Sequence, residues 1–238
     1  MELDVVDLRN FYQSRLGLTV RRIIAQEVRQ RWRPMHGATV AALGYGVPYL
    51  GPMRSWAGHM AALMPETQGA LVWPSATAPL SVLVEDRQLP LADNSVSRLL
   101  LVHSLEATDR PGVLLREVWR VLEPEGRVLI IVPNRRSVWA RIDTTPFGHG
   151  RPFSRSQLQR LLIDSLFTPL SWGSALHMPP VSWPVVLKSA QAWESVGRRL
   201  AGRFGGVLIV EARKELMAPI GGKKAGVRVL GELVPVGR

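Results

Sequence analysis

The chain has 238 residues, of which 46% are hydrophobic and 21% are charged. This is the composition of a globular protein rather than a disordered one, and the length fits one decorated α/β domain. Cysteine is absent, which excludes disulfides, thiolate metal sites and a cysteine nucleophile. The net charge is +11 and only four basic residues are lysine. An RNA or acidic partner is one interpretation of this charge, and a solvated arginine-rich surface is the other.

The N-terminus begins MELD and lacks the basic-then-apolar order of a signal peptide. The longest apolar runs, such as 128–132, are far shorter than the roughly 20 residues of a membrane span. Together with the absence of cysteine, these features predict a cytoplasmic protein without a membrane partner.

The N-terminal half combines apolar residues at helical spacing with short apolar runs that are typical of buried strands. A glycine within the first helical stretch is expected to break it in two. The predicted elements are helices over 5–32, with a break at Gly17, and over 53–65, and strands over 38–43, 69–73 and 81–84.

The C-terminal half continues this alternation. Pro111 suits the first turn of a helix, and Ser154 is a candidate N-cap. A polar loop rich in glycine and proline is predicted over 134–153. The remaining predicted elements are strands over 98–103, 127–132, 167–175 and 206–212, a turn at 124–126, and helices over 111–122, 154–164 and 185–203.

Strands that alternate with helices and carry continuous Val, Leu and Ile runs indicate a mostly parallel sheet of about seven strands, covered by helices on both faces. We expect three regions: an N-terminal helical segment over 1–36, an α/β domain over 37–213 and a basic tail over 214–238. Ligands of such sheets bind beyond the carboxyl ends of the strands, at the point where the strand order reverses.

Five short motifs follow one another in an order that carries more information than any one of them. A glycine turn after the first strand is weak evidence alone, but the other four are more specific. They are GYG at 44–46, LPLADNS at 89–95, LVHSLE at 101–106, LLREVWRVLEPEG at 114–126 and VLIIVPN at 128–134.

This series resembles the class I S-adenosylmethionine (SAM)-dependent methyltransferases, in particular the type 11 methyltransferase domain. The resemblance covers about 38–134 and implies a Rossmann-like fold, SAM as cofactor and transfer of a methyl group. It implies that the glycine loop packs against the methionine part of SAM and that an acid before LP binds the adenine amine. It also implies that His103 and Glu106 line the pocket, where His103 is a candidate base. The implied cofactor-binding residues are Gly44, Tyr45, Gly46, Glu85, Asp86 and His103, with Trp73 as a candidate stacking partner for adenine.

The chain also departs from the family pattern. Ala42 stands where an acid usually precedes the glycine loop, and Pro48 replaces the third glycine, so that its backbone offers no N–H. With the second strand predicted at 69–73, Trp73 and Pro74 stand where an acid usually holds the ribose. The loop is therefore predicted to be degenerate.

The long loop after residue 133 is predicted to bind the methyl acceptor. Its arginines and aromatic side chains favour an anionic or planar compound, and His149 is a second candidate base. The alternative is a surface connector or a subunit interface. The histidines show no metal-ligand spacing, so no metal is predicted. The candidate acceptor-binding residues are Arg135, Arg136, Trp139, Arg141, Phe147, His149 and Arg151.

Three functions follow as hypotheses. The first is methyl transfer from SAM to a small-molecule or RNA acceptor. The second is a methyltransferase-like protein that does not catalyse and instead binds a protein partner, which the departures from the pattern favour. The third is RNA binding through the arginine-rich surface, and the fold alone does not decide among them.

Overall fold

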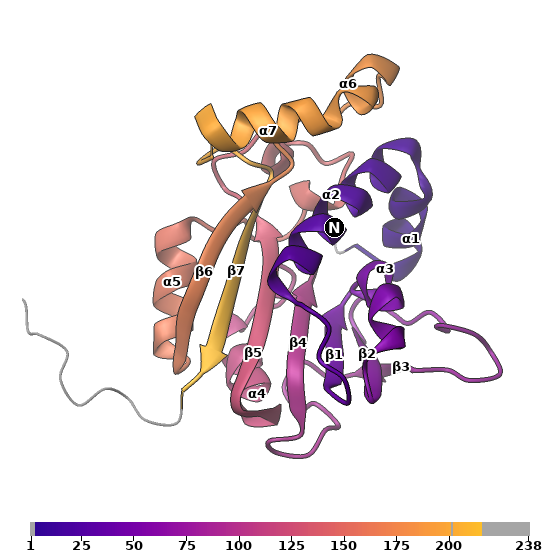
Figure 1. Ribbon diagram of the computed structural model, residues 1–238, viewed down its shortest axis with the longest axis vertical. Coiled ribbons are helices and arrows are strands. Elements are labelled where there is room, and N and C mark those ends of the chain that lie inside the picture. Colours follow the sequence, from indigo (N-terminus) through magenta and orange to yellow (C-terminus); the bar gives the residue numbers. More distant parts are fainter. Residues whose placement is uncertain (1–2, 201, 216–238) are drawn as a thin grey trace, which may run out of the picture.

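The computed structural model describes residues 3–200 and 202–215, and Figure 1 shows their arrangement. Seven strands form one sheet in the order β3-β2-β1-β4-β5-β7-β6. The paired strands are parallel except where β7 runs antiparallel to β5 and β6, so the predicted mostly parallel sheet is confirmed. The strands are β1 (Thr39–Gly44), β2 (His59–Pro65), β3 (Ser81–Val84), β4 (Val96–Val102), β5 (Leu122–Pro133), β6 (Phe167–Ala175) and β7 (Val207–Lys214).

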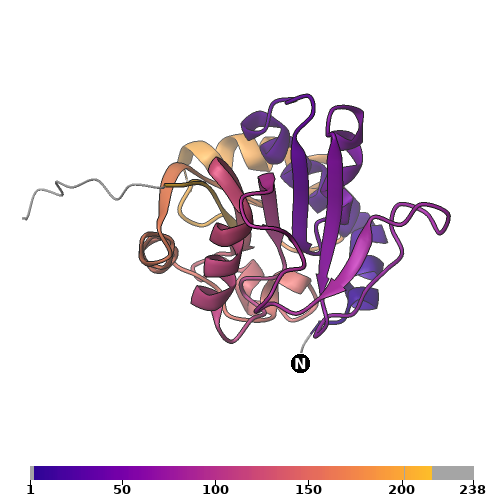
Figure 2. The ribbon, with the colours of Figure 1, turned by 90° about the horizontal axis from the view of Figure 1, so that it is seen from below.

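Helices cover both faces of this sheet, as Figure 2 shows from below. The helices α1, α2, α3, α6 and α7 pack on one face, and α4 and α5 pack on the other. The helices are α1 (Val5–Gln13), α2 (Arg15–Arg31), α3 (Val47–Leu50), α4 (Pro111–Val121), α5 (Arg155–Asp164), α6 (Pro184–Lys188) and α7 (Ala190–Leu200), with 3-10 turns η1 (Gly51–Ser55), η2 (Trp139–Arg141) and η3 (Pro146–Gly148).

The central strands are buried on both sides because successive side chains point to opposite faces. In β1, Val40 and Ala42 belong to the core beneath α1 and α2, whereas Ala41 and Leu43 belong to the core beneath α4. This explains why the strands read as continuous apolar runs rather than as alternating patterns.

The break in the N-terminal helical stretch lies at Ser14, whose side chain caps α2 through the backbone N–H of Gly17. The prediction of a break at Gly17 is therefore wrong. A β-carbon at Gly17 would lie 1.8 Å from the carbonyl oxygen of Phe11, so this glycine permits the close contact between α1 and α2.

The predicted helix over 53–65 is also wrong. His59–Pro65 forms β2, and the start of the predicted helix belongs to the 3-10 turn η1. Four apolar residues there have the three- and four-residue spacing of a helical face. A short strand that is buried on both sides is apolar throughout, so hydrophobic periodicity does not distinguish it from a buried helix. Residues 69–73 form no strand and lie in the loop that joins β2 to β3.

The C-terminal half follows the prediction more closely. Ser154 caps α5 with a full capping box. Residues 124–126 lie within β5 rather than in a separate turn, and the helix predicted over 185–203 is divided at Ser189. Strand β7 extends to Lys214, and the rest of the predicted tail lies outside the described residues beyond Glu215. In the described part of the chain, no helix is both long and apolar enough to cross a membrane.

Candidate functional site

The order of the strands reverses at β1, which pairs with β2 on one side and with β4 on the other. Gly44, the last residue of β1, lies beside Val102, the last residue of β4. Ligands of open α/β sheets bind at the carboxyl edge of such a switch point. The loops that follow β1, β2, β3 and β4 are therefore where a cofactor is expected.

An acidic groove lies at this edge, where β2 and β3 end. Glu66 directly follows β2, and Glu85 and Asp86 directly follow β3. These carboxylates line a cavity of about 310 Å³, and residues of the loop between β4 and α4 form its other wall. That second wall includes Ala107, Thr108, Asp109 and Arg110, whereas Thr67 and Arg87 lie beside the acids on the first wall.

Asp86 has the most perturbed environment of the three acids. Partial burial raises the pKa of its carboxyl group, the nearby charges of Glu66 and Glu85 raise it further, and a hydrogen bond with Thr108 acts in the opposite direction. Its Oδ1 atom is buried without a hydrogen-bond partner among the described residues. A ligand that brings a hydrogen-bond donor or a positive charge would relieve this cost of burial.

A smaller cavity of about 70 Å³ continues from the groove, since Thr67 and Ala107 line both. It is also lined by His103, Glu106 and His149. The structure therefore brings the two predicted catalytic histidines to one cavity, together with the carboxylate of Glu106.

His103 follows β4 in a left-handed conformation, with φ of 54° and 3% of its surface exposed. Its Nε2 atom lies 3.0 Å from the hydroxyl of Tyr12 in α1. Burial raises the pKa of the Tyr12 hydroxyl well above its ordinary value, so Tyr12 remains protonated and can donate this hydrogen bond. On the other side of the ring, Nδ1 lies 3.3 Å from Oε1 of Glu106 without hydrogen-bond geometry.

Glu106 is 4% exposed, and neither of its carboxylate oxygens has a hydrogen-bond partner among the described residues. The loop over 146–151 closes on it, because the backbone N–H of Arg151 donates to the carbonyl oxygen of Glu106 at 2.8 Å. Buried carboxylates are normally hydrogen-bonded. An unsatisfied one beside a cavity marks a place for a cationic or hydrogen-bond-donating ligand group.

The glycine loop packs against the protein itself. Gly44 has φ of 86°, and a β-carbon there would lie 2.2 Å from the carbonyl oxygen of Val102. The backbone N–H of Tyr45 donates to that same carbonyl, and the Tyr45 ring stacks on Tyr12 with centroids 5.3 Å apart. A β-carbon at Gly46 would collide with Ala42. The two glycines are thus required by contacts within the chain, and α1 covers the loop.

At the ribose end of the site, the structure differs from the prediction at two residues, Trp73 and Glu66. Trp73 packs against the core on the α1 side and lines neither the groove nor the small cavity, because its segment is a loop rather than the end of a strand. An acid does follow the second strand, namely Glu66. The prediction misses Glu66 because it places the second strand about ten residues too late. The apolar run 60–64 before Pro65 is the feature of the sequence that indicates the correct position of this strand.

The predicted acceptor loop is partly a core element. Trp139 and Phe147 are each 2% exposed, and the Trp139 indole donates to the carbonyl oxygen of Met178 at 2.7 Å. These two are therefore unavailable to an acceptor. Arg151 pairs with Asp109 at the surface, and His149 lies at the small cavity with Nε2 2.8 Å from the carbonyl oxygen of Asp143. The exposed side chains of the loop include Arg135, Arg136 and Arg141.

The residues present fit SAM in part. The acidic groove offers carboxylates for the adenine amine and the ribose hydroxyls, and Glu106 offers a carboxylate without a hydrogen-bond partner for a positively charged group. In the glycine loop, the backbone N–H of Tyr45 already donates within the chain, to the carbonyl oxygen of Val102. Among the described residues, no group of three or more His, Asp or Glu side chains is placed to hold a metal ion.

Residues 64–130 match the model of a methyltransferase domain family. Comparison with curated protein sequences finds no significant match. Among solved structures, a SAM-dependent methyltransferase from Thermotoga maritima is similar with a TM-score of 0.63 and 16% identity, covering 89% of this chain and 96% of that one.

A chain from the complex between the Trm112 methyltransferase activator of Haloferax volcanii and its methyltransferase is similar at a TM-score of 0.63 and 18% identity, covering 89% and 98%. A SAM-dependent methyltransferase from Aquifex aeolicus is similar at 0.57 and 17%, covering 87% and 96%. At these identities the structures establish the fold. Residues 64–130 thus match a methyltransferase domain, and the chain carries them on the class I methyltransferase fold.

Proposed function

We propose that this protein is a SAM-dependent methyltransferase whose cofactor lies along the acidic groove and reaches the cavity beside His103. The observation that carries the proposal is the placement of Glu66, Glu85 and Asp86 around one groove at the carboxyl ends of β2 and β3. This groove adjoins the switch point of a class I methyltransferase sheet and continues to the buried Glu106.

In this proposal the three groove carboxylates accept hydrogen bonds from the adenosine part of SAM. Glu106 faces the positively charged part, which removes the cost of an unpaired buried carboxylate. SAM bound there supplies an electrophilic methyl group on a positively charged sulfur. The chain mainly provides position, because the thioether is already a good leaving group.

The two histidines are proposed to handle the proton that an acceptor releases. His149 is the more accessible of the pair and lines the small cavity. His103 is held on its Nε2 side by the hydroxyl of Tyr12, and Glu106 lies beside its Nδ1 atom. We therefore assign His149 as the candidate base and His103 as the residue that positions the acceptor end.

The acceptor is proposed to approach over the loop that follows β5. Arg135 and Arg141 are exposed there, and neither forms an ion pair among the described residues. Their charge favours an anionic acceptor, either a small molecule or RNA.

Calorimetric titration with SAM and with S-adenosylhomocysteine tests the proposal. The variant carrying E66A and E85A should bind both compounds about tenfold or more weakly, because each lost carboxylate removes charge-assisted hydrogen bonds. Both side chains are exposed, so folding should be preserved. The matched control is D164A, an exposed acid at the far end of α5.

Unaltered affinity in the double variant would place the cofactor elsewhere. G44V is unsuitable as a test, because its side chain would collide with the backbone of β4 and unfold the site.

A non-catalytic binding protein is the second candidate, and the covered glycine loop favours it. Tyr12 and Tyr45 close the place where the methionine part of the cofactor is expected, and the cavity beside them measures only about 70 Å³. This candidate predicts that a folded sample binds neither SAM nor S-adenosylhomocysteine and instead forms a stable complex with a protein partner.

A further inference from the structure

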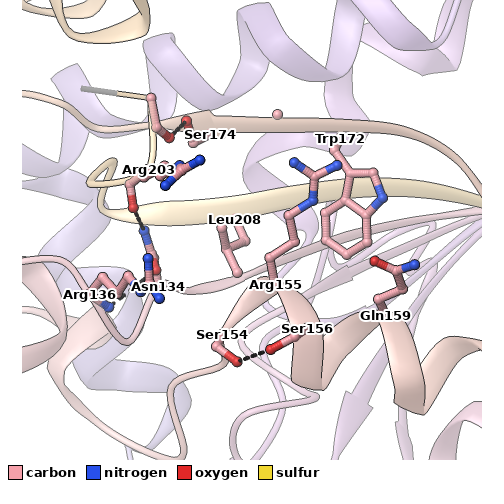
Figure 3. Close-up of a pocket in the computed structure, with 12 residues that line it drawn as sticks. Asn134, Arg136, Ser154, Arg155, Ser156, Gln159, Trp172, Ser174, Arg203 and Leu208 are labelled. Carbon is pink, nitrogen blue, oxygen red and sulfur yellow. Dashed lines mark hydrogen bonds between the residues drawn. The ribbon is translucent and has the colours of Figure 1, made fainter. Parts of the chain in front are cut away.

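A second cavity, of about 540 Å³, lies on the α5 side of the sheet and shares no lining residue with the acidic groove. Figure 3 shows its walls: the first turn of α5, the end of β6 and the segment that leads into β7. Three arginines also line it: Arg136 from the loop after β5, Arg155 from α5 and Arg203 from the segment that leads into β7. A volume of this size suits a small molecule.

The charged side chains that line this cavity are all positive. All three arginine side chains are exposed to solvent, and within residues 3–200 and 202–215 none forms an ion pair. No acidic residue is among those that line the cavity. Arg155 lies over the Trp172 ring at 4.9 Å from its centroid, which orients the guanidinium group. Three cations that line one concave site give it a positive potential that attracts an anion.

The buried side-chain amide of Asn134 holds the backbone of two of these arginines in place. Asn134 is 2% exposed, and its side-chain nitrogen donates to the carbonyl oxygens of Arg203 and Gly205 at 3.0 and 2.8 Å. Its Oδ1 accepts from the backbone N–H of Arg136 at 3.2 Å. Ser174 fixes the same segment by donating to the carbonyl oxygen of Gly202. The backbone that carries these arginines is therefore organised without a ligand, which lowers the entropic cost of binding one.

The remaining lining supplies hydroxyl groups and an apolar surface. Ser154 and Ser156 lie at the start of α5, and their hydroxyl oxygens are 3.2 Å apart. These hydroxyl groups can donate to an anionic oxygen. Trp172 and Leu208 provide the apolar part. The arginine fork matches the oxygens of a phosphoryl group in geometry as well as in charge.

We propose that this cavity binds a small organic phosphate with two or more negative charges. The phosphoryl group lies among Arg136, Arg155 and Arg203, and the organic part rests against Leu208 and Trp172. This binding site does not depend on the proposed methyl transfer, because it uses none of the residues of the acidic groove.

Calorimetric titration of the full chain with pyrophosphate and with phenyl phosphate, at constant ionic strength, tests the proposal. Saturable one-to-one binding is expected. R155Q and the variant carrying R136Q and R203Q should each weaken it about tenfold or more. R155K retains the charge but not the fork and should lie between R155Q and the unaltered protein. R116Q, an exposed arginine on α4 outside the cavity, is the matched control and should have no effect.

Three results would overturn the proposal. The first is the absence of saturable binding to the folded protein. The second is an equal loss of affinity in R116Q, which would show only general attraction to a basic chain. The third is binding of a short single-stranded RNA that neither pyrophosphate nor R155Q weakens. Because all three arginines are exposed, thermal melting should show that the variants remain folded.

Discussion

At the scale of single residues, the carboxylate of Glu106 is the least satisfied group beside the candidate site. It is almost fully buried, and Nδ1 of His103 lies 3.3 Å from its Oε1 atom. An unpaired buried carboxylate costs free energy of folding, and a neutral amide of the same shape costs less. Proteins retain such groups at sites where a ligand compensates them.

E106Q is therefore expected to leave the melting temperature unchanged or to raise it by a few degrees, while weakening SAM about tenfold or more. Thermal melting and calorimetric titration measure the two effects on one sample. A fall in melting temperature of more than about 5 °C would show instead that the carboxylate stabilises the fold through His103.

His103 and Tyr12 show why single-residue patterns mislead. The sequence predicts His103 as the last residue of a strand, and in the structure it directly follows β4. Its Nε2 partner comes from α1, 91 positions earlier. Trp139 and Phe147 likewise have the composition of a binding loop and lie in the core. Composition alone does not distinguish an aromatic side chain that contacts a ligand from one that packs.

At the scale of elements, Arg120 of α4 ties the connector between β3 and β4 to the helix. It donates to Asp93, to both oxygens of Glu117, and to the carbonyl oxygens of Leu89 and Leu91. These hydrogen bonds hold the pKa of the Glu117 carboxyl below its usual value of 4.5. The network fixes the segment that leads from the acidic groove into β4.

R120Q should lower the free energy of unfolding by about 1–2 kcal/mol near neutral pH. The loss is kept this small because the Arg120 side chain is partly exposed, so solvent screens its interactions. Because the folded pKa of Glu117 is depressed, its contribution is present above pH 4.5 and is lost as the pH falls through the folded pKa. The difference between the unaltered protein and R120Q should therefore be constant above about pH 5 and smaller below about pH 4.

Urea unfolding at several pH values measures this difference, and R116Q on the same helix is the control. A difference that increases toward acid pH would contradict the role assigned to Glu117.

At the scale of the whole molecule, the net charge of +11 governs how stability responds to salt. The repulsion among excess arginines is screened over about 10 Å at 0.1 M ionic strength. Exposed ion pairs, which salt also weakens, contribute little. The melting temperature should therefore rise by a few degrees between low and physiological salt.

Phosphate at the same ionic strength should raise the melting temperature further than chloride, because it also binds the arginine cavity. R155Q should lose this additional increase and retain the increase caused by chloride. A melting temperature that falls with salt would mean that favourable ion pairs outweigh the repulsion.

What the sequence determines by itself is the class of fold. Apolar runs such as 98–103 and 127–132 identify central strands because both faces of those strands are buried. Pro111 and Ser154 mark helix starts correctly because capping is a local interaction. The order of the motifs then identifies the class I methyltransferase fold.

Tertiary structure decides the contents of the site. The position of β2, and with it the role of Glu66, depends on pairing with β1 rather than on local periodicity. The closure of the glycine loop depends on Tyr12 from another element, and the arginine cavity unites side chains from three distant segments. Spacing along a chain encodes local conformation, whereas contacts between distant segments arise only when the core of the sheet brings them together.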